Sequence, residues 1–244
     1  MANIPMGSVI LEGVCTAFMT FITIKTLKRY LERKLKVILL LLLSFVFTLL
    51  GIATSFLGRL IVYTANWQAK YTHVFVIPAE ILILFGVLTM FYFSDIIFDF
   101  AYSRILISIA SVTTGITIGM LIYNGIFYPV YSYGTEPAKI YFIASIFNAI
   151  TIGGMYLTIF LFGIYRSKGE KNILRKRSTE IISSYGILAF LSLVMFSIDA
   201  LISYDFTHYL ATYYFGWILV LLAIIGAYLG YFLPTCFKRI IRLN

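Results

Sequence analysis

The sequence has little charge and few residues of the kinds that bind metals or form disulfides. Only 12% of its 244 residues are charged, and it contains two cysteines and two histidines. Soluble domains carry about 25% charged residues, so this composition excludes an ordinary soluble domain. Cys15 and Cys236 form no CxxC or Cys/His spacing, so we expect no disulfide framework, no metal site and no cofactor.

The motifs of soluble enzymes are also missing. The chain contains no Walker loop and no GxGxxG, HExxH or GxSxG pattern. Asp95 and Asp99 in "DIIFD" have a spacing that can hold Mg²⁺ and a diphosphate, as in membrane prenyltransferases, but those enzymes use two such motifs. The preferred alternative is a solvated helix end whose acids pair with Arg104 or the basic segments. We therefore predict no catalytic residue and a non-enzymatic protein.

Long apolar runs are what the chain has instead. It is 61% hydrophobic, with a mean hydropathy of +0.96, and a membrane-spanning helix needs about 20 mostly apolar residues. The composition and run lengths predict a single all-α domain of seven transmembrane helices, multi-pass in the cell membrane and surrounded by lipid. The predicted helices cover residues 5–24, 37–63, 73–98, 105–128, 139–165, 180–204 and 211–235.

The basic residues gather between these runs on one side. Six lie in 25–36, six in 165–177, three in 236–242 and one at Arg104, so this side holds 16 of the 19 Lys and Arg residues. The positive-inside rule makes this side cytoplasmic, with the N-terminus outside and the C-terminus inside. We expect the basic clusters to contact a cytoplasmic partner, other membrane subunits or lipid, and not nucleic acid. The residues are Lys28, Arg29, Arg33, Arg175, Lys176 and Arg177.

Aromatic residues concentrate at the opposite, outer ends of the runs. Trp and Tyr are enriched where a membrane meets water, so we expect these side chains to form an outer aromatic belt. The predicted belt consists of Trp67, Trp217, Tyr63, Tyr71, Tyr131, Tyr133, Tyr209, Tyr213 and Tyr214.

Polar residues inside the apolar runs are the candidates for a binding site. A charged residue at the bilayer centre costs about 2.5–3.5 kcal/mol on insertion scales, and such residues usually face the protein interior or a wet cavity. We predict an outward-facing cup in which Arg59 pairs with one or more acids, and the excess acid is protonated or binds a small ligand or cation from outside. The alternative is a set of wet, interfacial side chains with no ligand. The cup residues are Glu12, Arg59, Glu80, Asn124 and Asp199, with Asn148 deeper.

Two weaker patterns concern how the helices pack. "GRLIVY" at 58–63 and "DALISY" at 199–204 each end a predicted helix that follows a basic segment, which suggests a 3+1+3 helix repeat. "GITIG" (115–119) and "GAYLG" (226–230) place glycines four apart, a spacing that lets helices approach closely. For the two glycine patterns, packing within the bundle is the preferred interpretation, and dimerisation is the alternative.

The end of the chain resembles the exit of the seven-helix sensory regions of prokaryotic, especially archaeal, signalling proteins. Gly230, Tyr231, Phe232, Leu233 and Pro234 match the Gly-aromatic-aliphatic-Pro step that ends their last helix, and basic residues follow at Lys238 and Arg239. The resemblance implies a sensory module, although no kinase, cyclase or methyl-accepting output sequence follows here.

Three functions fit these features. The leading one is a receptor or sensor-like protein whose outer pocket acts through a partner. The alternatives are a small-molecule or ion transporter or channel built on the repeat, and a structural subunit of a larger membrane complex.

Overall fold

The computed structural model describes residues 5–67, 72–100, 102–127, 136–203 and 211–232, and within them the chain forms seven α-helices and no strand. All seven are long and apolar enough to cross a membrane, so the all-helical, membrane-type prediction is confirmed. The helices are α1 (Met6–Arg33), α2 (Lys36–Thr64), α3 (His73–Phe98), α4 (Ser103–Phe127), α5 (Glu136–Gly169), α6 (Ile173–Ser203) and α7 (Ala211–Phe232).

The basic segments are helix ends, and not the loops that hydropathy predicts. α1 continues nine residues past the predicted end at residue 24, and α6 begins seven residues before the predicted start at residue 180. Lys, Arg, Glu and Leu are good helix formers, so the backbone stays helical after hydropathy falls. α1 stops at Lys34, whose φ of 50° and N–H bond to the Tyr30 carbonyl form a left-handed C-terminal cap.

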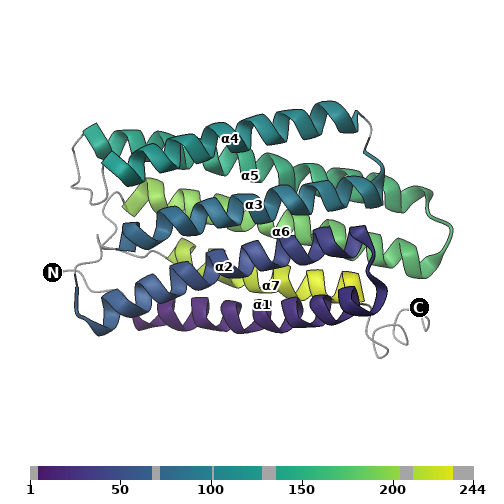
Figure 1. The fold of residues 1–244 in the computed structure, drawn as a ribbon, viewed down its shortest axis with the longest axis horizontal. Coiled ribbons are helices and arrows are strands. Elements are labelled where there is room, and N and C mark those ends of the chain that lie inside the picture. The colour runs from purple at the N-terminus through teal and green to yellow at the C-terminus, as the bar shows by residue number, and fades with distance from the viewer. Residues whose placement is uncertain (1–4, 68–71, 101, 128–135, 204–210, 233–244) are drawn as a thin grey trace.

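Six of the helices form a closed ring, and α4 lies at its edge (Figure 1). Around the ring α1 packs on α2, α2 on α3, α3 on α5, α5 on α6, α6 on α7, and α7 returns to α1. α4 packs against α3 and α5. Figure 1 also shows that the chain reverses direction at each connection. α1 and α7 therefore run parallel, and both start at the end of the bundle opposite the basic segments. We call that end the N-terminal end, and the other the basic end.

Glycines allow neighbouring helices to pack closely at several positions, most of them outside the two GxxxG patterns. A Cβ on Gly186 of α6 would lie 2.8 Å from the Tyr156 carbonyl oxygen of α5, so only glycine fits there. The preferred interpretation of "GITIG" is wrong, because a Cβ on Gly115 or Gly119 would meet nothing within 4 Å. In "GAYLG" only Gly230 packs closely, against Ile182 of α6.

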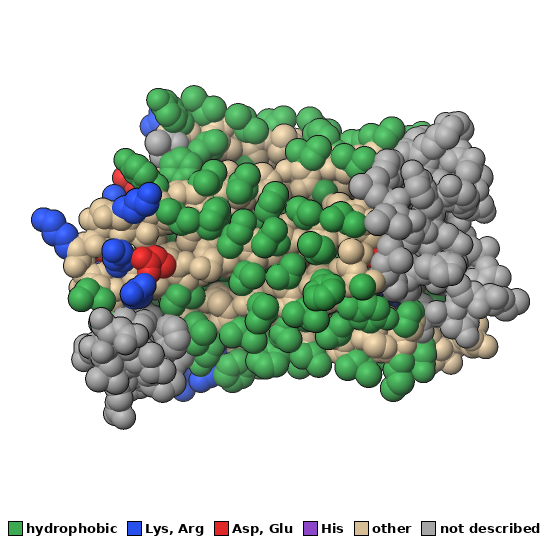
Figure 2. Space-filling view, turned by 180° about the vertical axis from the view of Figure 1, so that it is seen from behind, with side chains coloured by type: hydrophobic (Ala, Val, Ile, Leu, Met, Phe, Trp, Pro, Cys, Tyr) green, Lys and Arg blue, Asp and Glu red, His purple; other side chains and the backbone are tan. Residues whose placement is uncertain are grey.

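The surface separates into an apolar middle and a charged end. Figure 2 shows hydrophobic side chains over the length of the bundle and Lys and Arg side chains gathered at the basic end. Large apolar residues such as Ile109, Ile116, Leu161 and Leu222 are exposed on the sides. A continuous apolar surface of this extent is typical of helices that face lipid.

Candidate functional site

Glu12 faces the interior of the bundle and not the surrounding lipid. The buried residues of α1 recur at intervals of three and four, which is the repeat of one helix face, and Glu12 lies on that face between Val9 and Cys15. Its side chain is 0% exposed. A carboxylate at such a position requires partners, because burying an uncompensated charge is costly.

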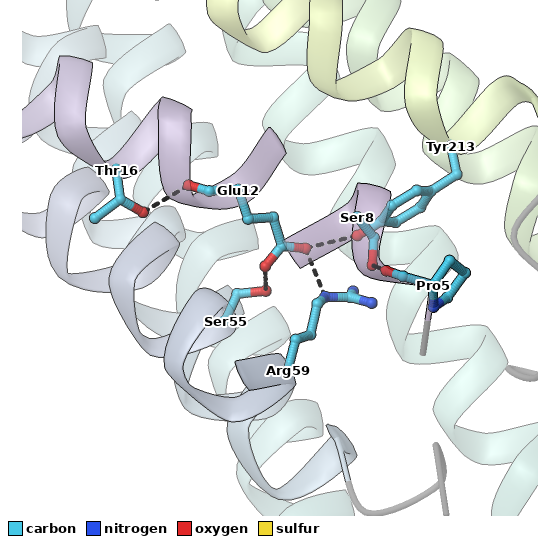
Figure 3. Close-up of polar contacts among 7 residues, drawn as sticks. All are labelled: Pro5, Ser8, Glu12, Thr16, Ser55, Arg59 and Tyr213. Atoms are coloured by element: carbon cyan, nitrogen blue, oxygen red, sulfur yellow. Dashed lines mark hydrogen bonds and ion pairs between the residues drawn. The ribbon is translucent and has the colours of Figure 1, made fainter. Parts of the chain in front are cut away.

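Three side chains from two other helices supply those partners (Figure 3). Arg59 of α2 forms an ion pair through Nε with Glu12 Oε1 at 2.5 Å. The Tyr213 hydroxyl of α7 donates to the same oxygen at 2.6 Å, and the Ser55 hydroxyl of α2 donates to Oε2 at 3.2 Å. Glu12 therefore joins α1, α2 and α7 at a single carboxylate. We call Glu12, Arg59, Ser55 and Tyr213 the Glu12 cluster.

Arg59 is held in position by more than its charge. Its guanidinium carbon lies 5.1 Å from the centre of the Tyr213 ring, within the range of a cation–π contact. The Arg59 side chain is 12% exposed, whereas that of Glu12 is 0% exposed. Arg59 is therefore the more exposed member of the pair.

Aromatic rings of α6 and α7 surround Tyr213. Phe196 lies 5.8 Å and Trp217 6.5 Å from the Tyr213 ring, measured between ring centres, and Phe196 and Trp217 contact each other edge to face. Tyr213 and Trp217 are both buried, so their predicted place in the outer aromatic belt is wrong. Both lie on the face of α7 that packs into the bundle, and the Tyr213 hydroxyl completes the coordination of Glu12.

Asp199 of α6 is tied to the same turn of α7. It is buried, and its Oδ1 accepts a hydrogen bond from Thr212 at 3.1 Å. Thr212 directly precedes Tyr213, so consecutive residues of α7 hold two carboxylates, Asp199 and Glu12. Both contacts fall in the first turn of the helix, where the backbone dipoles favour negative charge.

The structure places the other predicted cup residues on different helices. Glu80 is half-buried on α3, and Asn148 is buried on α5. Asn124 lies in α4, but its side chain is outside the described residues. The structure thus joins Glu12 directly to Arg59 and brings Asp199 to the adjacent residue of α7, while convergence of Glu80 and Asn124 with them stays a prediction.

The predicted partner-contact residues lie at the basic end. Lys28, Arg29 and Arg33 belong to the last turns of α1, and Arg175, Lys176 and Arg177 to the start of α6. The Asn172 side chain caps α6 by accepting the backbone N–H of Leu174 at 3.0 Å. Arg177 forms an exposed ion pair with Glu180 at 3.0 Å.

The acid pair of "DIIFD" lies at this end too. The Asp95 carboxylate accepts a hydrogen bond from Ser103 at 2.8 Å, and Asp99 is the left-handed cap of α3. Within the described ranges neither acid pairs with Arg104, so that predicted ion pair is wrong. No group of three or more His, Cys, Asp or Glu residues that would hold a metal is found in the described part of the chain.

Sequence reasoning missed Ser55 and gave Tyr213 the wrong environment. Ser55 precedes Arg59 by four residues, so both lie on one face of α2, and that spacing is the signal that could have identified Ser55. Tyr213 carried no comparable signal, since tyrosines at helix ends are common at interfaces.

Comparison with protein-family models, with curated proteins and with solved structures finds no match for this chain. The fold and the site define an all-helical bundle of seven membrane-type helices with a buried ion pair near one end.

Proposed function

We propose that the protein is a non-enzymatic, seven-helix membrane receptor or sensor-like module whose Glu12 cluster responds to a small ligand or cation from outside. Seven apolar helices support a place in the membrane. The concentration of Lys and Arg at one end supports an orientation with that end in the cytoplasm and the Glu12 cluster near the outer surface. The tail sequence, which resembles the exit of prokaryotic sensory regions, supports signalling through a partner.

The Glu12 network is the observation that carries this proposal. An ionisable residue inside a membrane-type helix indicates a functional site, and a buried ion pair is weak support for stability. Here one carboxylate holds three helices together through Arg59, Ser55 and Tyr213. A cation or amine that competes with Arg59 for Glu12 would loosen α7 from α1 and α2. That movement would reach the basic end, where the partner is expected.

The test is a ligand screen read by tryptophan fluorescence. The chain has two tryptophans, so Trp67→Phe leaves Trp217, whose ring lies 6.5 Å from that of Tyr213, as the single reporter. In this background we would titrate purified protein with Na⁺, K⁺, Ca²⁺, methylamine and guanidinium at constant ionic strength. We expect a saturable change in Trp217 emission with at least one of these probes.

The matched control separates binding at the cluster from general charge effects. Glu12→Gln removes the buried charge, whereas Glu32→Gln removes an exposed charge from the other end of the same helix. The saturable response should persist in Glu32→Gln and disappear in Glu12→Gln. An equal response in both variants, or no response to any probe in the parent, would contradict the proposal.

Transport is the second candidate, and a polar seam between α4 and α5 favours it. The Thr117 and Thr151 hydroxyls lie 3.4 Å apart midway along the bundle. One turn before Thr151, the buried Asn148 Oδ1 has no hydrogen-bond partner among the described residues. In α1–α3 and in α5–α7 alike, the middle helix packs against the other two, and α4 separates the two groups along the chain, as a 3+1+3 arrangement requires. Flux of the ligand into proteoliposomes that is abolished by Asn148→Leu would favour transport over sensing.

A further inference from the structure

A second charged site lies at the basic end, remote from the Glu12 cluster. Lys25, Lys28, Arg29, Glu32 and Arg33 follow each other at intervals of three, one, three and one, so they form one face of α1. Together with Phe232 of α7 they line a groove of about 230 Å³. Four cations and one anion give the groove a net charge of +3.

The groove lies where the last turns of α1 pack beside the last described turn of α7. With a rise of 1.5 Å per residue, the 28 residues of α1 extend about 42 Å, whereas the apolar core of a bilayer is about 30 Å thick. The last turns of α1 therefore continue beyond the apolar zone and lie beside the C-terminal turn of α7. Arg29 contacts that turn, because its Nη1 donates to the Tyr231 carbonyl at 2.9 Å and its guanidinium lies 5.6 Å from the Phe232 ring.

The remaining cations of the groove are available to a ligand. Lys25, Lys28 and Arg33 are exposed, and none of them forms an ion pair with a carboxylate in the described part of the chain. Like charges that share one helix face repel each other. This arrangement is stabilised when an anion occupies the groove.

An aromatic surface continues from the groove toward the middle of the bundle. Phe232 stacks on Tyr228 with ring centres 5.4 Å apart, and Tyr228 contacts Phe21 of α1 at 5.7 Å. Lys25 Nζ lies 5.3 Å from the centre of the Phe21 ring, so it marks the boundary between the basic and aromatic parts. Phe21 is exposed, so this surface faces the surrounding lipid. A cationic groove at headgroup depth beside an apolar surface matches both parts of a phospholipid molecule.

We propose that this α1–α7 groove is a binding site for an anionic phospholipid, with the phosphate at Lys25, Lys28 and Arg33 and an acyl chain along Phe21, Tyr228 and Phe232. Basic pockets between helices at the membrane surface bind anionic headgroups, and each nearby Lys or Arg contributes about fivefold in affinity. Arg29 positions the wall of the site by holding the Tyr231 carbonyl. This inference does not depend on the function of the Glu12 cluster.

The experiment measures lipids retained by the full, delipidated chain in native mass spectrometry. The probes are phosphatidylglycerol and phosphatidylcholine with identical acyl chains. The test variant is Lys25→Gln/Lys28→Gln/Arg33→Gln. The matched control, Arg166→Gln/Lys168→Gln/Lys171→Gln, removes three exposed charges from the same end, but from the last turn of α5 and the α5–α6 connection. We expect parent and control to bind phosphatidylglycerol more tightly than phosphatidylcholine, and the test variant to bind phosphatidylglycerol at least tenfold more weakly.

A soluble competitor distinguishes a lipid from a free phosphate compound. Glycerophosphoglycerol carries the same headgroup without acyl chains, and we expect it to displace the lipid only at much higher concentration. Equal displacement would overturn the lipid assignment. Equal binding of the two lipids, or equal losses in test and control variants, would overturn the site. The six substituted residues are all exposed, so unaltered thermal unfolding will confirm that the variants remain folded.

Discussion

Removal of Arg59 should destabilise the protein far more than removal of both members of its ion pair. Arg59→Met leaves the Glu12 carboxylate fully buried, with only the Tyr213 and Ser55 hydroxyls as the observed donors. Breaking a buried pair by deleting one partner costs about 3–5 kcal/mol. Because two hydrogen bonds remain, we expect the lower end of that range, about 3 kcal/mol in the free energy of unfolding.

The double variant Glu12→Met/Arg59→Met should recover most of this loss. Methionine fills a similar volume and carries no charge, and replacing a buried ion pair by apolar residues is often neutral or stabilising. The Tyr213 and Ser55 hydroxyls then lose their acceptor, which together costs about 1 kcal/mol. The double variant should therefore be about 2 kcal/mol more stable than Arg59→Met alone.

The assay is thermal unfolding in one detergent, with an exposed ion pair as the control. A change of 1 kcal/mol shifts Tm by about 2–4 °C in proteins of this size, so Arg59→Met should lower Tm by roughly 6–12 °C. Arg177→Met breaks the exposed pair with Glu180, and such pairs contribute about 0.5 kcal/mol or less. An Arg59→Met shift no larger than that of Arg177→Met would refute the reasoning. So would a double variant whose loss equals the sum of the two single losses.

Two further predictions concern individual contacts. Tyr213→Phe keeps the ring but removes the hydroxyl 2.6 Å from Glu12, so it should lower the free energy of unfolding by about 1.5–3 kcal/mol. Ser55→Ala removes a hydroxyl 3.2 Å from Glu12 and should lower it by less than about 1 kcal/mol. Chemical unfolding that gives the reverse order would contradict the geometry. Gly186→Ala should lower Tm by several degrees, because its Cβ would lie 2.8 Å from a backbone oxygen of α5. Gly115→Ala meets open space and should be neutral or stabilising by up to about 1 kcal/mol, so equal effects of the two alanines would refute this packing.

The number of helices and their apolar segments could be predicted because both depend on local chemistry. α3 agrees with the apolar run 73–98 from end to end, since turn residues and charge bound that run on both sides. The true ends of α1 and α6 could not be predicted from hydropathy, because Lys, Arg and Glu continue a helix as well as Leu does. Helix length beyond the membrane is thus a property of backbone propensity, which an apolar run does not report.

The candidate site was predictable only as a set of residue types at a common depth. Glu12 and Arg59 are conspicuous in apolar helices, and two opposite charges near one end predict an ion pair. Which acid pairs with Arg59 depends on the order of helices around the ring, and α1 is the direct neighbour of α2 there. Tyr213 joins the cluster for the same reason, because the closure of α7 on α1 brings together residues 201 positions apart.

Contacts near both ends of the bundle hold α7 against α1. Tyr213 bonds to Glu12 near one end, and the Tyr231 carbonyl accepts from Arg29 near the other. Glu12 and Arg29 are separated by about 25 Å along α1, and Tyr213 and Tyr231 by about 27 Å along α7, at 1.5 Å per residue. Two parallel helices joined at matched positions cannot slide past each other while both bonds persist. Loss of the Tyr213–Glu12 bond would therefore remove one restraint on sliding at the N-terminal end, while the Arg29–Tyr231 bond at the basic end would remain.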